Sequence, residues 1–285
     1  MKTKHKIIIG DSTNMKEVGN NSIALVITSP PYPMIKMWDE MFEKVGAKTY
    51  NEMHNYLSKI WRECYRVLID GGICCINIGD ATRRVNNNFK LYPNHSKTIE
   101  LCEDIGFKTL PFILWKKATM KPNAFLGSGF LPPNAYITQD CEFILIFRKG
   151  DLRKFEDPLI RYKSKYTKEE RDKWFSQVWE VNGVKQNRDK LLRRTAEYPS
   201  EIVYRLIRMF SVIGDTILDP FLGTGTTLEI AKKLQRNSIG YEIDKNLLPI
   251  IKERLDLNKL EGEDTEIKII MGGDKVEEKI EYNNS

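Results

Sequence analysis

The sequence of 285 residues predicts an α/β protein built on a mostly parallel β-sheet that is covered by helices. Short apolar runs alternate along the chain with segments of helical periodicity, as such a sheet requires. The run Ile23–Thr28 is apolar almost throughout, which indicates a strand buried on both faces. The length suffices for one large domain that carries a small insertion.

Seven strands and five helices are expected. The strands are predicted at Lys6–Ile9, Ile23–Thr28, Gly72–Ile78, Leu110–Trp115, Glu142–Phe147, Thr216–Leu218 and Ser238–Glu242. The helices are predicted at about Tyr50–Leu68, Ser96–Ile105, Ser200–Phe210, Thr226–Leu234 and Lys245–Leu257. In Ser200–Phe210 the apolar residues fall on one stripe, and the preceding Pro199 suits a helix entrance.

The composition is that of a soluble globular protein, with 41% apolar and 29% charged residues. No apolar run approaches the roughly 20 residues that span a bilayer, and Met1–Ile9 does not resemble a signal peptide. We therefore expect a cytoplasmic protein with no membrane partner. A net charge of +6 is compatible with a polyanionic partner but is weak evidence alone.

No metal site is expected. The five cysteines include no C-x-x-C pair, and three histidines complete no zinc-ligand pattern. Reduced thiols buried in the core are the simpler interpretation of Cys64, Cys74, Cys75, Cys102 and Cys141.

Residues 150–197 interrupt the alternation of strands and helices. They are polar, charged and aromatic, with 13 Lys and Arg against 9 Asp and Glu, a net charge of +4. A segment of this length inside a compact domain is usually functional or a small insertion. The chain is thus predicted to divide into residues 1–149, an insertion at 150–197, residues 198–258 and a tail at 259–285, in which Ile267–Met271 could form a terminal strand.

The strongest local signal is Thr28-Ser29-Pro30-Pro31-Tyr32, which directly follows a predicted buried strand. The two prolines fix the backbone and supply no N–H donors, so their carbonyl groups are available as acceptors. Open α/β sheets bind ligands at the carboxyl ends of their strands, where this loop should lie.

Such a loop could activate the exocyclic amine of a nucleic-acid base, whose lone pair is delocalised into the ring. Acceptors at Ser29 and the Pro30 carbonyl would draw both amine hydrogens out of the ring plane and direct the lone pair toward a methyl donor. Tyr32 could stack on an extruded base. A rigid turn that merely contains serine and tyrosine is the structural alternative.

A glycine loop forms the second signal, in the sequence from Asp219 to Thr227. Gly223 and Gly225 allow a close approach of the backbone to a ligand at the start of a helix. Glu242 ends the next strand, 17 positions after Gly225, near the spacing at which a carboxylate meets ribose hydroxyls. The Gly-Lys-Ser/Thr ending of a phosphate-binding loop is absent, so a nucleoside cofactor is favoured.

Together, Thr28–Tyr32, Asp219–Thr227 and Gly240–Glu242 resemble the amino-methylating DNA methyltransferases of restriction–modification systems. The order, with the proline loop before the glycine loop, is similar to that of the beta group of this family. The resemblance covers about residues 5–258 except the middle of 150–177. Further similar segments are Ile9–Ser12, Gly71–Asp80, Trp115–Lys117, Glu142–Lys149, Val178–Val181 and Tyr198–Glu201.

This resemblance implies a circularly permuted, seven-stranded, Rossmann-like methyltransferase fold that uses S-adenosyl-L-methionine, with a target-recognition insertion. It implies a catalytic set of Ser29, Pro30, Pro31 and Tyr32. It implies cofactor binding by Asp11, Ser12, Ser200, Asp219, Pro220, Phe221, Gly223, Gly225, Thr226 and Glu242.

The resemblance also implies the partners. Double-stranded DNA is the expected substrate, and a restriction endonuclease acting on the same site is a second expected partner. In this family a serine at the position of Ser29 usually accompanies methylation of cytosine N4. The loops 81–94 and 119–135 could share base reading with the insertion. The candidate DNA-binding residues are Arg83, Arg84, Arg161, Lys163 and Lys165.

Several alternatives stay open. Methylation of adenine N6 is the nearest, followed by methylation of RNA or of a protein amide. A silent DNA- or nucleoside-binding module would keep the fold without the reaction. Methylation of cytosine carbon 5 is disfavoured, because that chemistry is tied to a Pro-Cys nucleophile and the sequence contains no Pro-Cys dipeptide.

Overall fold

The computed structural model describes residues 2–85, 88–117, 137–183, 198–255, 265–271 and 275–282. Its strands are β1 Thr3–Ile9, β2 Ile23–Thr28, β3 Leu68–Ile78, β4 Ala81–Val85, β5 Asn88–Tyr92, β6 Lys108–Lys116, β7 Cys141–Arg148, β8 Val178–Glu180, β9 Thr216–Asp219, β10 Asn237–Glu242, β11 Thr265–Met271 and β12 Lys275–Tyr282. Its helices are η1 Lys36–Trp38, α1 Asp39–Lys44, α2 Tyr50–Val67, α3 Asn94–Ile105, α4 Pro158–Lys163, α5 Lys168–Trp174, α7 Ser200–Phe210, α8 Thr226–Lys233, η3 Lys245–Leu247 and α9 Leu248–Arg254.

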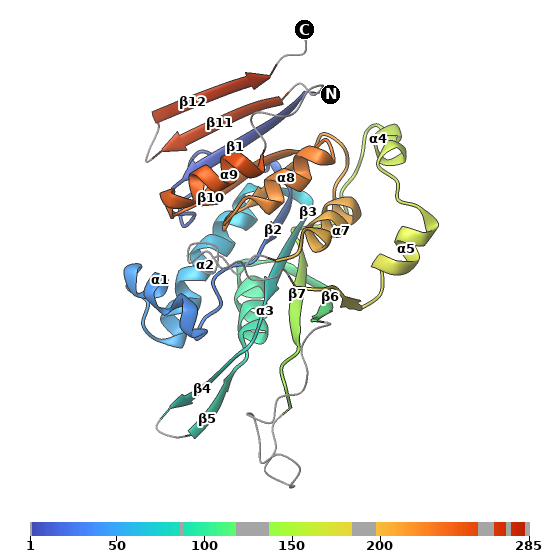
Figure 1. Cartoon of the computed structure of the whole chain (residues 1–285). Coiled ribbons are helices and arrows are strands. Elements are labelled where there is room, and N and C mark those ends of the chain that lie inside the picture. The colour runs from blue at the N-terminus through green and yellow to red at the C-terminus, as the bar shows by residue number, and fades with distance from the viewer. Residues whose placement is uncertain are drawn as a thin grey trace.

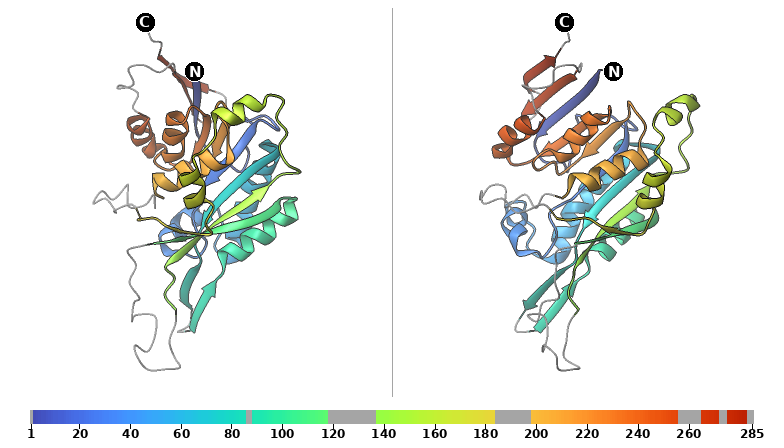
Figure 2. Two further views of the ribbon diagram at one scale, coloured as in Figure 1. Left: turned by 90° about the vertical axis from the view of Figure 1, so that its right-hand side faces the viewer. Right: turned by 45° about the vertical axis from the view of Figure 1, so that its right-hand side comes forward.

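A twisted sheet with helices on both faces forms the centre of the molecule (Figures 1 and 2). Among the described residues it has ten strands in the order β12-β11-β1-β10-β9-β2-β3-β7-β6-β8. All seven predicted strands are present and form one continuous block, from β1 to β6 in that order. The prediction of a mostly parallel α/β sheet is confirmed.

Five neighbouring strands, β1, β10, β9, β2 and β3, run parallel to one another. Their carboxyl ends therefore meet along one side of the sheet, called here the carboxyl edge, and their amino ends meet along the opposite, amino edge. Strand β7 is antiparallel to both of its neighbours, β3 and β6. The carboxyl edge brings together five loops, which follow Ile9, Thr28, Ile78, Asp219 and Glu242.

The sheet is longer than predicted at both ends. Strands β11 and β12 extend it beyond β1, and the predicted terminal strand Ile267–Met271 lies within β11. Strand β8, three residues long, pairs with β6 at the other end. Three residues are too few for a periodic pattern, which explains why the sequence did not predict β8.

Side chains of β2 alternate between two layers of the core. Val26 packs on one face with Trp61 of α2, whereas Leu25 and Ile27 pack on the other with Ile202 of α7. All four of these aliphatic side chains are at most 1% exposed. This two-sided burial is the physical reason for the apolar run in the sequence.

The long helices lie close to their predicted bounds, and the short ones were missed. A capping box between Thr49 and Glu52 starts α2. The predicted helix Lys245–Leu257 is η3 followed by α9, which ends at Arg254. Most of the predicted loop 81–94 is a hairpin of β4 and β5, and the predicted loop 119–135 lies outside the described residues.

The segment that follows β7 folds along the amino edge. Arg153 forms a bidentate ion pair with Asp215, at 2.7 and 2.8 Å. The backbone amide of Ile213, two residues before Asp215, donates to Ser164 Oγ at 2.9 Å. Arg208 pairs with Glu170 of α5 at 3.0 Å. Because residues 208–215 lead into the start of β9, helix α4 lies at the amino edge, far from the β4–β5 hairpin (Figure 1). None of the described helices is both long and apolar enough to cross a membrane.

Candidate active site

A cavity of about 460 Å³ opens at the carboxyl edge. Its walls come from the loops after β1, β2, β9 and β10, and from residues 37–45 of η1 and α1, which cover it from one side. Of the residues predicted as functional, it is lined by Asp11, Ser12, Ser29, Pro31, Pro220, Phe221, Gly223 and Glu242. The structure thus joins the two motifs, which lie about 190 residues apart in sequence, at one site.

Glu242 forms an acidic wall of this cavity. One carboxylate oxygen accepts from the amide of Gly223 and the other from the amide of Asp244, both at 2.8 Å. Gly223 has a φ of 56°, a conformation that suits glycine. Burial raises the pKa of Glu242 to about 7. The glycine loop and the acid are therefore held as one rigid unit.

Asp219 lies behind the cavity and ties the two motifs together. Its carboxylate, 1% exposed, accepts hydrogen bonds from Thr28 Oγ1 (2.8 Å), Thr227 Oγ1 (2.6 Å) and the amide of Phe221 (3.0 Å). Burial raises the pKa of Asp219 to about 6. Because Thr28 directly precedes Ser29, this buried carboxylate fixes the proline loop relative to the glycine loop.

Besides Asp219, three predicted cofactor residues lie outside the cavity. Gly225, with a φ of 93°, forms the N-terminal cap of α8 and contacts Ile251. Thr226 is buried and hydrogen-bonded to Arg254. Ser200 is exposed at the start of α7 and lines a separate depression with Glu229 and Lys233.

The Ser29 hydroxyl belongs to a chain of polar groups behind the proline loop. Tyr32 Oη donates to Glu142 Oε2 (2.7 Å), and Asn77 Nδ2 donates to Tyr32 Oη (2.7 Å) and to Glu142 Oε2 (2.8 Å). Ser29 Oγ lies 3.1 Å from Tyr32 Oη. Since the single proton of Tyr32 goes to Glu142, Ser29 must be the donor in its bond with Tyr32. Asn77 Nδ2 also donates to Ser29 Oγ, at 3.4 Å, so one lone pair of Ser29 remains to accept from a ligand.

Burial and the charge of Glu142 raise the pKa of Tyr32 well above its usual range. The ring of Tyr32 lies against Gly79, where an added Cβ would come within 3.1 Å of a ring carbon. Neither Tyr32 nor Pro30 lines the cavity itself. Asn77 and Glu142 were not predicted as functional residues, because only the tertiary fold brings them to Tyr32.

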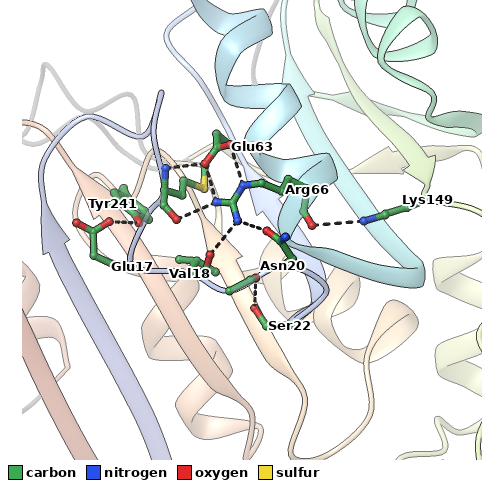
Figure 3. Close-up of polar contacts among 10 residues, drawn as sticks. Glu17, Val18, Asn20, Ser22, Glu63, Arg66, Lys149 and Tyr241 are labelled. Atoms are coloured by element: carbon green, nitrogen blue, oxygen red, sulfur yellow. Dashed lines mark hydrogen bonds and ion pairs between the residues drawn. The ribbon is translucent and has the colours of Figure 1, made fainter.

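The loop between β1 and β2, which carries Asp11 and Ser12, is clamped to α2 (Figure 3). Arg66 donates to the carbonyls of Met15 (2.9 Å) and Val18 (3.1 Å), and Glu63 accepts from the amide of Met15 at 2.7 Å. Farther along α2 toward its start, Tyr56 Oη donates to Asp11 at 3.2 Å. These contacts fix the wall of the cavity that Asp11 and Ser12 form, next to Glu242 at the end of the neighbouring strand β10.

The predicted DNA-binding residues fall into two groups. Arg83 and Arg84 lie on the β4–β5 hairpin, where Arg84 is exposed and Arg83 instead donates to the Met34 carbonyl (2.5 Å) and pairs with Asp39. Arg83 therefore holds the segment that covers the cavity. The other group, at the amino edge, comprises Arg161, Lys163 and Lys165.

Four of the five cysteines are buried and unpaired, and Cys141 is half-buried. Burial raises the pKa of the thiols of Cys64, Cys74, Cys75 and Cys102, which keeps them protonated. Within the described ranges, His, Cys, Asp and Glu side chains form no group of three that could hold a metal ion.

A nucleotide-sized cavity at the carboxyl edge of an open α/β sheet, with a glycine loop and an acid on adjacent strands, defines a nucleoside-cofactor enzyme. A family model for DNA methylases that act on N6 or N4 matches residues 23–253. The chain is 59% identical to the type II methyltransferase M.MjaI of Methanocaldococcus jannaschii, with 95% of this chain and 98% of that protein covered. It is 49% identical to M.MthZI of Methanothermobacter thermautotrophicus, with 90% and 78% covered.

Solved structures agree with the fold. A Thermus thermophilus protein described as a DNA modification methylase, solved with S-adenosyl-L-methionine, is 30% identical. It superposes with a TM-score of 0.72 over 92% of this chain and 99% of that one. The cytosine-N4-specific PvuII DNA methyltransferase, 17% identical, has the same fold, with a TM-score of 0.65 over 91% and 89%.

The chain belongs to the family of N6- and N4-amino DNA methyltransferases. It is a DNA methyltransferase that uses S-adenosyl-L-methionine, and the cofactor implied by the family resemblance is confirmed.

Proposed function

We propose that this enzyme transfers the methyl group of S-adenosyl-L-methionine to N4 of cytosine in duplex DNA. The observation that carries the proposal is the position of Ser29. Ser29 lines the cavity beside the glycine loop. Its proton is engaged by Tyr32 and one of its lone pairs by Asn77, so its second lone pair is left for a substrate amine.

The cavity fits the cofactor in size and chemistry. Its volume lies within the range of small-molecule sites. Glu242 would accept from the ribose hydroxyls, and Asp11 and Ser12 would contact the adenine end. When bound, the cofactor supplies an electrophilic methyl group on a sulfonium centre. Phe221 and Pro220 would close the apolar side of the cavity.

On the substrate side, the proline loop would activate the amine. Ser29 Oγ accepts one amine hydrogen and the Pro30 carbonyl accepts the other, which localises the lone pair on nitrogen. Tyr32 would form one wall of the base pocket, with its ring seated on Gly79 and its hydroxyl held by Asn77 and Glu142. A base could reach this site only after rotation out of the duplex.

A neutral hydroxyl at this position favours cytosine. Cytosine presents two acceptors on the same edge as its amine, N3 beside the amine and O2 beyond it, and a carboxylate at the position of Ser29 would repel them. Within the family a serine here usually accompanies N4 methylation, as the sequence resemblance implies. Adenine N6 is the alternative site of methylation.

For DNA binding we propose the β4–β5 hairpin in the first place. It follows β3 at the carboxyl edge, and Arg84 and Lys90 are exposed on it. Such side chains could meet phosphates on either side of an extruded base. Arg161, Lys163 and Lys165 lie at the opposite edge, so a duplex at the active site would have to extend around the sheet to reach them.

The biological role we propose is the protection of host DNA. The relatives M.MjaI and M.MthZI are type II methyltransferases, and such an enzyme would act with an endonuclease that recognises the same site.

The product decides between the two bases. Plasmid DNA from a methylation-free host, treated with the purified enzyme and cofactor, would be digested to nucleosides and analysed by mass spectrometry. We expect N4-methylcytosine. N6-methyladenine would overturn the argument from Ser29 and keep the fold and cofactor, whereas 5-methylcytosine would refute activation of an amine.

A further inference from the structure

We propose that the carboxylate of Glu142 is the final acceptor of the proton released by the reaction, and that this proton travels from the amine through the hydroxyls of Ser29 and Tyr32. The inference rests on the proposed function only in that an exocyclic amine docks at Ser29. It applies to cytosine N4 and adenine N6 alike.

The hydrogen bonds have the direction that such a transfer needs. Tyr32 donates to Glu142 over 2.7 Å, and Ser29 donates to Tyr32 over 3.1 Å. An amine hydrogen that points at Ser29 Oγ would be the third donor in the same sense. Every hydrogen bond in this series is therefore already directed toward Glu142.

Proton balance requires an acceptor. When the amine nitrogen bonds to the methyl carbon, the bond from that carbon to sulfur breaks and its electron pair stays on sulfur. The nitrogen then carries two hydrogens and the new methyl group, together with a positive charge, and it must lose one proton. That proton passes to Ser29 Oγ while the Ser29 proton moves to Tyr32 and the Tyr32 proton moves to Glu142. Both hydroxyls end neutral, and Glu142 ends as a carboxylic acid.

The contacts around Glu142 fix its carboxylate with one oxygen directed at Tyr32. Oε2 accepts from Tyr32 and Asn77, and Oε1 pairs with Lys117 at the end of β6. Its side chain is 12% exposed and that of Lys117 is 31% exposed, so the proton can leave to solvent on that side.

The described groups that can titrate near Glu142 include Cys141 of its own strand, whose thiol donates to Asp140, and groups from three neighbouring elements. Lys117 comes from β6 and Tyr32 from the proline loop. On the side of α3, His95 stacks on Phe143 at 4.0 Å and bonds to Asp80. Of these, Lys117 and Tyr32 contact the carboxylate directly, and these two contacts are the ones to alter.

A purely structural role for Glu142, in which it only holds Tyr32 in place, predicts a different outcome. Glu142→Gln keeps an oxygen that can accept from Tyr32 but removes the proton acceptor. Tyr32→Phe keeps the ring but removes the hydroxyl. If Glu142 only positions the ring, these variants should have small and unequal effects.

The test measures a single turnover on a duplex that contains one target site. We expect Glu142→Gln and Tyr32→Phe each to slow methyl transfer by roughly 10²-fold, the usual contribution of general base catalysis. The double variant should be no slower than either single variant, because both interrupt the same proton path. The solvent deuterium isotope effect of the native enzyme should fall in both variants.

Two measurements without turnover show that the site is intact. Calorimetric affinity for S-adenosyl-L-methionine should stay within about twofold of the native value. The fluorescence of 2-aminopurine at the target position should report the same extent of base extrusion. Rate loss that is matched by loss of either signal would assign Glu142 to structure and overturn the relay.

The pH dependence supplies an independent check with a matched control. Lys117→Met removes the cation that contacts the Glu142 carboxylate and favours its charged form, so the acidic limb of the single-turnover rate should move to higher pH. Glu142→Gln should abolish that limb. Lys116→Met, which alters the neighbouring exposed pair of Lys116 and Glu180, should leave it in place. An acidic limb that is unchanged in Lys117→Met and Glu142→Gln would overturn the proposal.

Discussion

The carboxyl and amino edges of the sheet carry segments that were assigned a function from different kinds of sequence signal, and these segments differ in what they contact in the structure. At the carboxyl edge, short motifs from β2, β9 and β10 converge on one cavity. At the amino edge, the basic and aromatic segment after β7 packs through ion pairs such as Arg153 with Asp215. The segment also contributes to the core, because Trp174 and Trp179 pack in the same cluster as Ile202.

This difference shows how far each kind of sequence signal predicts the position of a segment in the fold. A motif that follows a buried strand has a defined place, because the topology of an open sheet sets where carboxyl ends meet. Basic composition states only that a segment is charged, and its charges can pair within the protein. Arg153 and Arg208 do so here, with Asp215 and Glu170. The predictions below test this contrast, beginning with the largest expected effect.

Ser29→Ala should slow methyl transfer by roughly 10²–10³-fold, which is the cost of losing one preorganised polar contact to the reacting group. Cofactor affinity should be unchanged, since Ser29 is proposed to contact the amine. Single-turnover rates and calorimetry measure the two quantities. Ser164→Ala at the amino edge is the matched control, and it should alter stability without altering the rate. Equal rate losses in the two variants would remove the distinction between the edges.

Asp219→Ala should lower the free energy of unfolding by about 2–4 kcal/mol, because it leaves two buried hydroxyls and the half-buried amide of Phe221 without their acceptor. Cofactor affinity should fall as well, since the glycine loop loses its anchor. Chemical denaturation monitored by circular dichroism measures the first effect. Arg153→Ala breaks the pair with Asp215 at the amino edge and should not alter cofactor affinity. A stable Asp219→Ala variant with native affinity would contradict the role given to this carboxylate.

Cofactor binding should depend on pH through Glu242. The folded protein holds a proton on this group up to about pH 7, above the ordinary range of a glutamate. Ribose hydroxyls donate to the carboxylate, so binding should release a proton, and affinity should fall as pH decreases below 7, by up to about tenfold per unit. Titration calorimetry in buffers of different ionisation enthalpy would detect the release.

Glu242→Ala should lose this dependence and bind the cofactor about 1.5–3 kcal/mol more weakly at pH 8. The same raised pKa affects stability with a definite sign. The contribution of Glu242 to the free energy of unfolding is fully present below about pH 4.5 and is lost as pH rises through 7. Affinity that does not change between pH 6 and 8 would show that the ribose does not contact Glu242.

The smallest expected effect concerns DNA binding by the two basic groups. Arg84→Gln with Lys90→Gln should reduce the slope of log affinity against log salt by about 0.9 for each phosphate contact that is lost. The triple substitution of Arg161, Lys163 and Lys165 by Gln is the comparison at the amino edge, and we expect little change from it. Fluorescence anisotropy with a labelled duplex at several salt concentrations measures both. A larger loss from the triple variant would place the DNA interface on α4.

The sequence by itself determined the seven-stranded block, its mostly parallel character and the identity of the two loops. These features depend on local patterns, namely apolar runs for strands buried on both faces and proline or glycine loops at strand ends. The resemblance of the motifs to a known family added the cofactor. Residues such as Ser29, Gly223 and Glu242 could therefore be predicted to meet before any coordinates were considered.

Only the tertiary structure decided which polar groups stand behind those loops. Asn77 and Glu142 lie 48 and 113 positions after Ser29, on β3 and β7, and the antiparallel pairing of these strands places them beside Tyr32. The tertiary structure also places Arg83 in an ion pair with Asp39. Side-chain partners across a sheet depend on strand order and register, and neither follows from the composition of a segment. This dependence is the physical reason why the sequence could predict a candidate active site but not the hydrogen bonds that support it.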